Sequence, residues 1–340
     1  MNRQDIRLAL PSKGRLAADA LDFLAEAGLR VHKPNPRQFE ASIPNLPDLS
    51  VLFQRAGDIA VSVREGSVDF GITGWDVVSE RAGRNGEIIA MQRQLGFGEC
   101  TLEVIVPESW QATKAMADLP AGTSEQPLRV ATKFPNLTQA FFEKHNLTPV
   151  ELIKSEGTLE AAPAIGYAQV IVDLVSTGTT LRDNRLKPLQ DGRILASQAC
   201  LVANRQALRD RPEVLEMGRL LLEYIEAHLR ANANVAVFAN IRGESKRAVA
   251  ESIFSQRVIG GLQGPTISPV ITRERQDWFA VNIIVRRDRL TEAIAELRSI
   301  GGSGVVVMPV TYIFEEEPDA YRDLLSQLDG NEEPKGKGQL

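Results

Sequence analysis

One stretch of the sequence, VIVDLVSTGTTL at residues 170–181, constrains the fold of this chain more than any other. An apolar run of strand length carries Asp173 near its end, and a turn of small or hydroxylated residues then leads into a helix-like segment. Backbone N–H groups of such a turn, with its hydroxyls, can surround the oxygens of one phosphate. The turn consists of Ser176, Thr177, Gly178, Thr179 and Thr180. It predicts a site for a sugar phosphate beside Asp173; the alternative is a solvated polar loop.

Strand-like and helix-like stretches alternate before and after this turn. Apolar residues alternate over 6–10 as in a strand, and a helical period then runs to Gly28. A helix over 56–67 leads into a short apolar strand at 68–74. Further strands are expected at 101–106, 128–132, 150–153, 169–174 and 193–204, and helices near 136–145 and 158–166. This alternation predicts the α/β class, with a mostly parallel sheet covered by helices.

The α/β part is expected to divide into two lobes. The glycines of LGFG at 95–98 interrupt the pattern before a new apolar run begins. Lobe I would take residues 1–98 and 193–211, because the apolar run at 193–204 is expected to return to the first sheet, and lobe II would take 99–192. A long helix at 212–232 would link this core to the rest of the chain.

Beyond the linker the order of elements changes. The pattern predicts a strand at 235–240, a helix at 244–256, strands at 266–271 and 278–285, a helix at 288–299 and a strand at 304–308. This βαββαβ order is typical of a ferredoxin-like domain, here at 233–314. An acidic tail at 315–340 follows, with a short helix expected at 318–328.

Charged side chains follow other predicted strands. Lys13 and Arg15 lie in the loop PSKGR, between the first strand and the N-terminus of a helix, where anions are favoured. Ligands of open α/β sheets bind beyond the carboxyl ends of the strands, so these cations are candidates for phosphate binding. Arg55 precedes a helix and Asp76 follows the strand at 68–74. For both, the alternative to ligand binding is a helix-capping position.

The chain resembles the ATP phosphoribosyltransferases in their long form, which carry out the first step of histidine biosynthesis. The turn at 176–180 is similar to the loop that binds phosphoribosyl diphosphate (PRPP) in phosphoribosyltransferases. The other matching segments run through nearly the whole chain: ALPSKGR at 9–15, RAGDI at 55–59, DFGITGWD at 69–76, LGFGEC at 95–100, VATKFPNLT at 130–138, DLVSTGTTLRDN at 173–184, GLQGPTISPV at 261–270 and GSGVVVMPV at 302–310.

The resemblance implies transfer of the 5-phosphoribosyl group from PRPP to N1 of ATP, which gives N1-(5-phosphoribosyl)-ATP and pyrophosphate. It implies Mg²⁺ bound mainly through the substrate phosphates. It further implies a two-lobed core like that of type II periplasmic binding proteins and a ferredoxin-like domain that senses histidine as an inhibitor. Dimers that assemble into a hexamer are the implied oligomer.

Residue roles carry over onto the matching segments. Asp173 and the turn of Ser176, Thr177, Gly178, Thr179 and Thr180 would bind PRPP, with Glu160 near the ribose or the metal. Lys13, Arg15 and Arg55 would contact the pyrophosphate or the phosphates of ATP, and Asp76 would face ATP or a basic partner. Asp173, Lys13 and Arg15 are the catalytic candidates.

The histidine site would include Asn240, Leu262 and Thr266. Here the sequence departs from the family pattern. The stretch at 240–256 is longer than usual, and Asn240 stands where some relatives place an acid. Loss of that acid would remove a charged partner for the effector.

Composition narrows the class of partner. Formal net charge is −5, and the eight acids and three bases of residues 315–340 account for all of it. The remaining chain is neutral, so a broad cationic surface for nucleic acid is not expected and anion binding must be local. The two cysteines and three histidines lie far apart, which predicts neither a disulfide framework nor a metal site and fits the cytoplasm. No window reaches the roughly 18 apolar residues of a membrane span.

Three alternative functions remain. The chain could be a two-lobed binding or sensor protein without catalysis, a phosphoribosyltransferase for another base, or an inactive regulatory subunit. The Asp173 turn and the lack of a secretion-signal pattern disfavour the first. Matching segments outside the turn disfavour the second, and the presence of both Lys13 and the turn disfavours the third.

Overall fold

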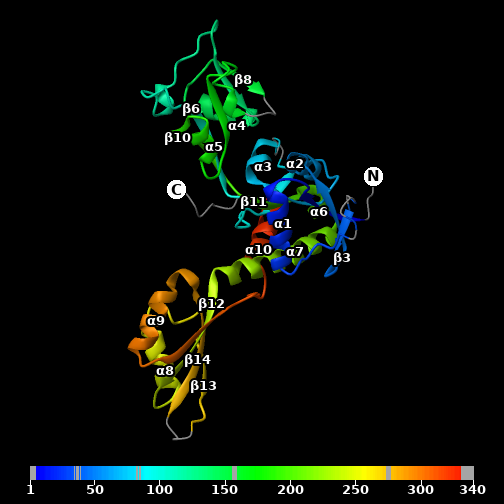
Figure 1. Ribbon diagram of the computed structural model, residues 1–340. Helices are drawn as coiled ribbons and strands as arrows, with labels where there is room; N and C mark the ends of the chain where they lie inside the picture. Colours follow the sequence, from blue (N-terminus) through cyan, green and yellow to red (C-terminus); the bar gives the residue numbers. More distant parts are fainter. Residues whose placement is uncertain are drawn as a thin grey trace. The chain divides into compact units, whose positions relative to one another are not determined.

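The structure, a computed structural model, describes residues 5–33, 35, 38, 40–81, 83, 86–154, 159–272 and 277–330. The chain divides into two compact units, whose elements are labelled in Figure 1. Unit 1 comprises Met1–Ala25, Leu29–Arg219 and Ala320–Leu340, and unit 2 comprises Glu26–Gly28 and Leu220–Asp319. None of the helices within the described ranges has both the length and the apolar character needed to cross a bilayer.

The first sheet of unit 1, which with its helices we call lobe I, has the strand order β2-β3-β1-β4-β11-β5. Its strands are β1 (Ile6–Pro11), β2 (Glu40–Ile43), β3 (Leu46–Gln54), β4 (Phe70–Gly74), β5 (Ile88–Gln92) and β11 (Ala199–Asn204). Strands β3, β1 and β4 are parallel, and β4 is buried along its whole length, as expected for a central strand. Each of these three strands is followed by a helix: α1 (Arg15–Glu26) after β1, α2 (Ala56–Arg64) after β3 and α3 (Trp75–Arg81) after β4.

The second sheet of unit 1 forms lobe II and has the order β10-β6-β9-β7-β8. Its strands are β6 (Cys100–Pro107), β7 (Leu128–Thr132), β8 (Val150–Lys154), β9 (Val170–Val175) and β10 (Leu186–Ser197), with helices α4 (Pro135–Lys144) and α5 (Thr179–Asp183). Strands β9, β7 and β8 are parallel, whereas β6 and β10 are antiparallel to their neighbours. The predicted two-lobed α/β core is therefore confirmed.

Three details of the predicted core are wrong. Both sheets are mixed rather than mostly parallel, because β6, β10 and β11, which lie next to the crossings between the lobes, run antiparallel to their neighbours. The single strand predicted at 193–204 is two strands, since β10 pairs in lobe II as far as Ser197 and β11 enters lobe I at Ala199. In the described part of the predicted helix at 158–166, only a 3₁₀ turn forms, at Leu159–Ala161.

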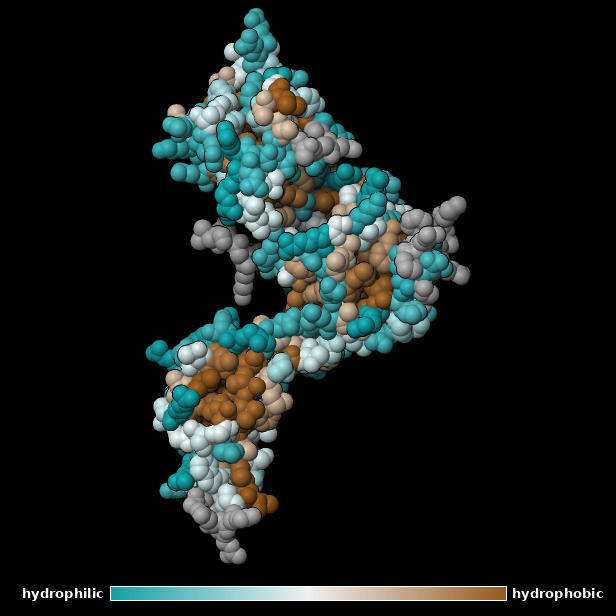
Figure 2. Space-filling view, viewed as in Figure 1, coloured by the Kyte–Doolittle hydropathy of each residue, from teal (hydrophilic) through white to brown (hydrophobic). Residues whose placement is uncertain are grey.

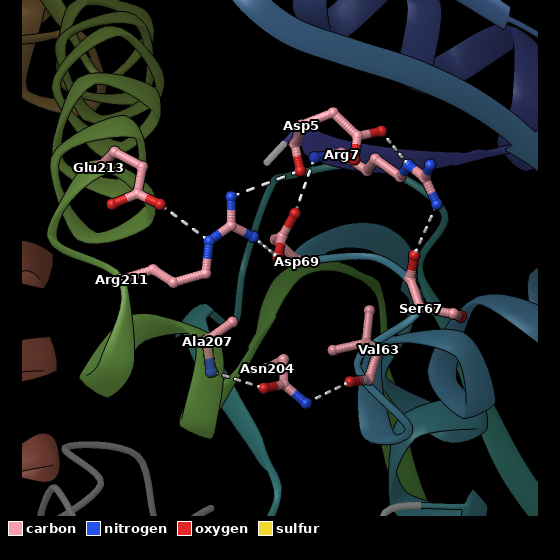
Figure 3. Close-up of polar contacts among 9 residues, drawn as sticks. All are labelled: Asp5, Arg7, Val63, Ser67, Asp69, Asn204, Ala207, Arg211 and Glu213. Atoms are coloured by element: carbon pink, nitrogen blue, oxygen red, sulfur yellow. Dashed lines mark hydrogen bonds and ion pairs between the residues drawn. The ribbon is translucent and has the colours of Figure 1, made fainter. Parts of the chain in front are cut away.

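A polar network fixes the edge of lobe I from which the chain departs (Figure 3). Asn204 accepts a hydrogen bond from the N–H of Ala207 at 2.7 Å, which caps a short helix, and its amide donates to the carbonyl of Val63 at 2.8 Å. Arg211 lies 3.1 Å from Asp69. The helices that follow Asn204 are α6 (Arg205–Asp210) and α7 (Pro212–Asn232).

The C-terminal helix α10 (Asp319–Leu328) also packs on lobe I. Arg205 donates to the carbonyl oxygen of Gln327 at 2.7 Å, and Arg209 donates to that of Leu328 at 2.5 Å. Guanidinium groups are favoured at the carbonyl end of a helix because the helix dipole is negative there. Leu324 is fully buried. The chain thus leaves unit 1 through α7 and returns to it through α10.

Unit 2 holds a four-stranded antiparallel sheet in the order β13-β14-β12-β15. Its elements are β12 (Asn234–Arg242), α8 (Lys246–Phe254), β13 (Thr266–Pro269), β14 (Trp278–Arg286), α9 (Leu290–Ser299) and β15 (Ser303–Pro309). This order along the chain and across the sheet confirms the predicted ferredoxin-like fold. Residues alternate along a strand between two faces, and here one face packs against α8 and α9 around Val237, Ile253, Ile283 and Leu297.

The other face of this sheet is open. Its apolar side chains Phe238, Val306 and Met308 are between 37% and 52% exposed. Figure 2 shows a concentration of apolar surface on unit 2. An exposed apolar patch of this kind marks an interaction surface in many soluble proteins.

Candidate active site

Three predicted cations gather at one edge of the lobe I sheet. Pro11 pairs with Gln54 at the last register position of β1 and β3, so the loops that follow these parallel strands leave the same edge. The N–H of Ser12 donates to the carbonyl of Gln54 at 2.7 Å and ties the two loops together. Lys13 lies in the loop after β1, Arg15 is the first residue of α1, and Arg55 directly follows β3; all three are exposed. This edge can therefore present three positive charges to a phosphate-bearing ligand.

Asp173 lies near the end of β9 in lobe II, opposite Glu103 of β6. Its Oδ1 accepts a hydrogen bond from the N–H of Leu174 at 2.8 Å. Burial raises the pKa of Asp173; the Leu174 N–H and the charge of Lys133 oppose this effect, and the charge of Glu160 adds to it. Asp173 and Glu160 line one small cavity of about 80 Å³. The structure therefore brings these two predicted carboxylates together.

The predicted phosphate-binding turn borders the same cavity. Ser176, Thr177, Gly178 and Thr180 line it, and the four hydroxyl-bearing residues of the turn are exposed. Gly178 has a φ of +69°, and a Cβ at this position would meet no atom within 4 Å. Glycine is therefore favoured here by the left-handed backbone conformation and not by a lack of space for a side chain. The Oγ1 atoms of Thr177 and Thr179 lie 3.2 Å apart. The turn thus presents hydroxyls and backbone N–H groups close to Asp173.

Asp76 lies apart from the exposed cations, and its side chain is only 5% exposed. Its Oδ1 accepts a hydrogen bond from the hydroxyl of Ser197 at 2.7 Å, and the backbone N–H of Asp76 donates to Oγ of Ser197 at 2.9 Å. Burial raises the pKa of Asp76, while the Ser197 hydroxyl and the N–H groups of Asp76 and Val77 lower it. These contacts hold Asp76 in the first turn of α3, against Ser197 of β10.

Arg93 and Trp75 also lie near the turn, and neither of them is among the site residues predicted from the sequence. Arg93 stacks over the ring of Trp75, with its guanidinium carbon 4.5 Å from the ring centroid. Both line a larger cavity of about 660 Å³ that also includes Arg193 and Ser197. This cavity shares Ser176 with the small one, so the two are neighbours. A space lined by two arginines, Arg93 and Arg193, and by Glu99 therefore adjoins the phosphate turn.

The three predicted effector residues lie in unit 2. Asn240 and Thr266 belong to β12 and β13 and are both exposed on the open face of the sheet, and Leu262 in the preceding loop is 49% exposed. Between β12 and β13, Asn282 of β14 pairs with Thr266 and Phe238. Oδ1 of Asn282 is buried and has no hydrogen-bond partner among the described residues. Such an acceptor is costly unless something donates to it.

Within the described ranges, no three His, Cys, Asp or Glu side chains gather closely enough to hold a metal ion. Cys100 and Cys200 are both free thiols. Burial raises the pKa of the Cys200 thiol to about 12, with a further contribution from the charge of Asp76, so this thiol is not a nucleophile at neutral pH.

Comparison with known proteins agrees with this geometry. The family model described as ATP phosphoribosyltransferase matches residues 55–226, and that of the HisG C-terminal domain matches residues 231–312. The chain is 45% identical over 337 residues to ATP phosphoribosyltransferase 2, chloroplastic, of Arabidopsis thaliana, with 96% of this chain and 82% of the relative covered. It is 39% identical over 328 residues to the ATP phosphoribosyltransferase of Rhodopseudomonas palustris, with 94% and 98% covered.

A solved structure is similar as well. The ATP phosphoribosyl transferase (HisG:HisZ) complex from Thermotoga maritima contains a chain that matches with a TM-score of 0.51 at 26% identity, covering 65% of this chain and 98% of that chain. The resemblance inferred from the sequence is confirmed. This chain belongs to the ATP phosphoribosyltransferase family, the transferases of the first step of histidine biosynthesis.

Proposed function

We propose that this chain binds PRPP at the Asp173 turn and transfers its 5-phosphoribosyl group to N1 of ATP, with the residues of the two lobes in distinct roles. One observation carries the proposal: Asp173, Glu160 and the exposed hydroxyls of the 176–180 turn share one cavity at the end of β9. The turn holds the 5-phosphate and Asp173 holds the ribose hydroxyls. Lys13, Arg15 and Arg55 meet the pyrophosphate and the phosphates of ATP at the edge of lobe I.

The reaction needs positioning more than proton transfer. The lone pair on adenine N1 forms the new bond to C1 of the ribose, and the bond from C1 to the pyrophosphate oxygen breaks, with its electrons leaving on pyrophosphate. Because N1 is unprotonated at neutral pH, no general base is needed to activate it. Asp173 stabilises the positive charge that develops on the ribose, and the three cations stabilise the leaving group.

Mg²⁺ fits the carboxylates of this cavity. Asp173 and Glu160 are oxygen donors whose charges repel each other, as the effect of Glu160 on the pKa of Asp173 shows. Mg²⁺ prefers oxygen ligands and binds through one or two carboxylates together with substrate phosphates. When bound, Mg²⁺ would neutralise part of the charge of the pyrophosphate group, with Asp173 and Glu160 as the residues that would hold it.

The ferredoxin-like unit is the proposed site of inhibition by histidine. Asn240 and Thr266 share the open face of the sheet, and the unpartnered Oδ1 of Asn282 lies at the register position between their strands. A histidine amino group or imidazole N–H supplies the donor that this oxygen lacks. Leu262 contributes an apolar contact.

Assembly and location follow from other features. The open apolar face around Phe238, Val306 and Met308 supports a homo-oligomer, which we propose is a hexamer built from dimers. The free thiols Cys100 and Cys200 support a reducing compartment, the cytoplasm. The proposed domains are lobe I at 1–98 with 193–211, lobe II at 99–192, a linker helix at 212–232, the regulatory domain at 233–314 and the tail at 315–340.

Pyrophosphate release tests the activity. The purified protein is mixed with ATP, PRPP and Mg²⁺, and release is compared with reactions that omit ATP or replace it with GTP. Release that depends on both ATP and PRPP is expected. No ATP-dependent release would overturn the proposal and favour a two-lobed binding protein, whereas release with another base would point to a different phosphoribosyl acceptor.

A further inference from the structure

The N-terminus of α4 is capped from outside its own lobe. Phe134 occupies the N-cap position and its side chain accepts no hydrogen bond, so the first N–H groups of the helix need another acceptor. Glu80 supplies two: Oε1 accepts from the N–H of Asn136 at 3.0 Å and Oε2 accepts from that of Leu137 at 3.0 Å. The side-chain amide of Asn136 also donates to the carbonyl of Glu80 at 3.1 Å.

This cap joins the two lobes. Glu80 belongs to α3 of lobe I, whereas α4 belongs to lobe II (Figure 1). The residue is 9% exposed, and a carboxylate at a helix N-terminus is stabilised both by the hydrogen bonds and by the helix dipole. The chain itself passes between the lobes before β6 and after β10. The cap is thus a non-covalent link in addition to these two connections.

The capped end of α4 is continuous with the Asp173 site. Thr132, the last residue of β7, pairs with Val172, the residue before Asp173. Lys133 follows Thr132, and its charge lowers the pKa of Asp173. The N–H of Phe134 donates to Oγ1 of Thr132 at 2.9 Å, so the segment between β7 and α4 is held at both ends.

We propose that Glu80 is a positioning residue of the transferase, which fixes Lys133 beside Asp173 and sets the approach of lobe I to lobe II by capping α4 across the lobe boundary. The inference rests on the proposed function in that the Asp173 turn holds PRPP in lobe II. Glu80 touches no reacting atom in this role. It matters because the cations of lobe I and the turn of lobe II must meet the same pair of substrates.

Replacement of Glu80 by glutamine tests the link. Glu80→Gln keeps the size of the side chain but replaces one acceptor by an N–H₂ group that faces a helix N–H. We expect kcat to fall about 10-fold or more, within the ~10²-fold that a displacement of 1 Å costs. The affinity for PRPP alone, measured by calorimetry, should change less than about 2-fold, because the turn lies wholly in lobe II. Glu143→Gln, at an exposed glutamate of α4, is the matched control.

Two further measurements separate positioning from a merely structural role. In a double-mutant cycle, Glu80→Gln should lower kcat by a smaller factor when Lys133 is already alanine, because only the change in the approach of the lobes then remains. Hydrogen exchange at the amides of Asn136 and Leu137 should accelerate in Glu80→Gln and not in Glu143→Gln. Additive effects in the cycle, an unchanged kcat, or unchanged exchange would overturn the inference.

The exchange measurement needs no substrate. If the wild-type chain released no pyrophosphate, the proposed function would fail while the cap itself could still be seen in the exchange of these two amides.

Discussion

Arg211 and Asp69 form an ion pair at 3.1 Å in which Asp69 is 1% exposed (Figure 3). The other carboxylate oxygen of Asp69 accepts a hydrogen bond from the N–H of Arg7 at 2.8 Å. The pair joins the amino ends of β1 and β4 to the residue that precedes α7. It therefore holds the start of the helix that leads out of lobe I, far along the chain from the Asp173 turn.

Removal of Asp69 should destabilise the chain without changing its chemistry. Because Asp69→Ala removes the acceptor of the Arg7 N–H and one of the two carboxylates that contact the Arg211 guanidinium, the other being that of Glu213, we expect a loss of about 2 kcal/mol in the free energy of unfolding. Urea unfolding followed by circular dichroism measures it. Pyrophosphate release per folded molecule should stay within about 2-fold of wild type. A loss below about 1 kcal/mol, the typical worth of an exposed pair, would contradict a buried structural role.

Replacement of Asp173 should separate activity from stability. Asp173→Asn removes the charge that faces the ribose, and we expect kcat to fall by about 10²-fold or more. Burial raises the pKa of Asp173 above 3.8, so the folded chain takes up a proton more readily than the unfolded chain, and this carboxyl stabilises the fold less as the pH rises from 3.8 through the raised pKa.

The asparagine variant lacks this titration. Its melting temperature at pH 7 should equal or exceed that of the wild type, and the difference should shrink toward pH 4. Differential scanning calorimetry at both pH values measures it. Near-normal turnover in Asp173→Asn would remove the assigned role, whatever its stability.

Ser197→Ala should destabilise the chain in a pH-dependent way. The Ser197 hydroxyl lowers the pKa of Asp76, which burial raises, so its removal raises that pKa further. Above the raised pKa the ionised carboxylate has lost its hydroxyl donor, at a cost of about 1–3 kcal/mol; below that pKa Asp76 is protonated and the cost is smaller. In urea unfolding at pH 8, 6 and 4, the difference in the free energy of unfolding from wild type should become smaller as the pH is lowered. Ser67→Ala, at an exposed serine, should give a constant difference.

The unpartnered acceptor of Asn282 predicts an effect on the effector. Asn282→Ala removes the Oδ1 that we assign to histidine, and Thr266→Ala removes its neighbour on β13. Each change should raise the histidine concentration for half inhibition by about 10-fold, the worth of one lost hydrogen bond of about 1.4 kcal/mol. Titration of pyrophosphate release with histidine measures it. Equal inhibition of both variants and the wild type would place the effector elsewhere.

Local patterns in the sequence were enough for most of the helices and strands and for the place of the 176–180 turn after a strand. The strand that ends at Val175, the glycine with positive φ at 178 and the βαββαβ order of unit 2 each depend on neighbouring residues, so periodicity and turn chemistry predict them. The mixed sheets were not predicted, because strand direction depends on where a strand pairs and not on its own sequence. The break at Gln198 was missed because apolar residues resume at Ala199 and no glycine or proline marks a turn there.

Contacts between distant residues had no such signal. Glu80 caps residues 56 and 57 positions later, and Ser197 bonds to Asp76 across 121 positions. The residues next to Glu80 in the sequence do not distinguish it from a surface glutamate. Those next to Ser197 do not distinguish it from an ordinary serine in a strand. The same holds for Lys133, which lies in the matching segment at 130–138 but comes near Asp173 only because β7 pairs with β9. Partners in the fold, rather than neighbours in the sequence, define these residues.

The packing of α10 against α6 gives the ferredoxin-like unit two attachments to lobe I. Arg205 and Arg209 donate hydrogen bonds to the last carbonyls of α10, so the unit is inserted between α7 and α10 and is not attached through one linker alone. A shortened chain that lacks α10 would therefore keep every residue of the open face of the sheet but would be joined to lobe I through α7 alone.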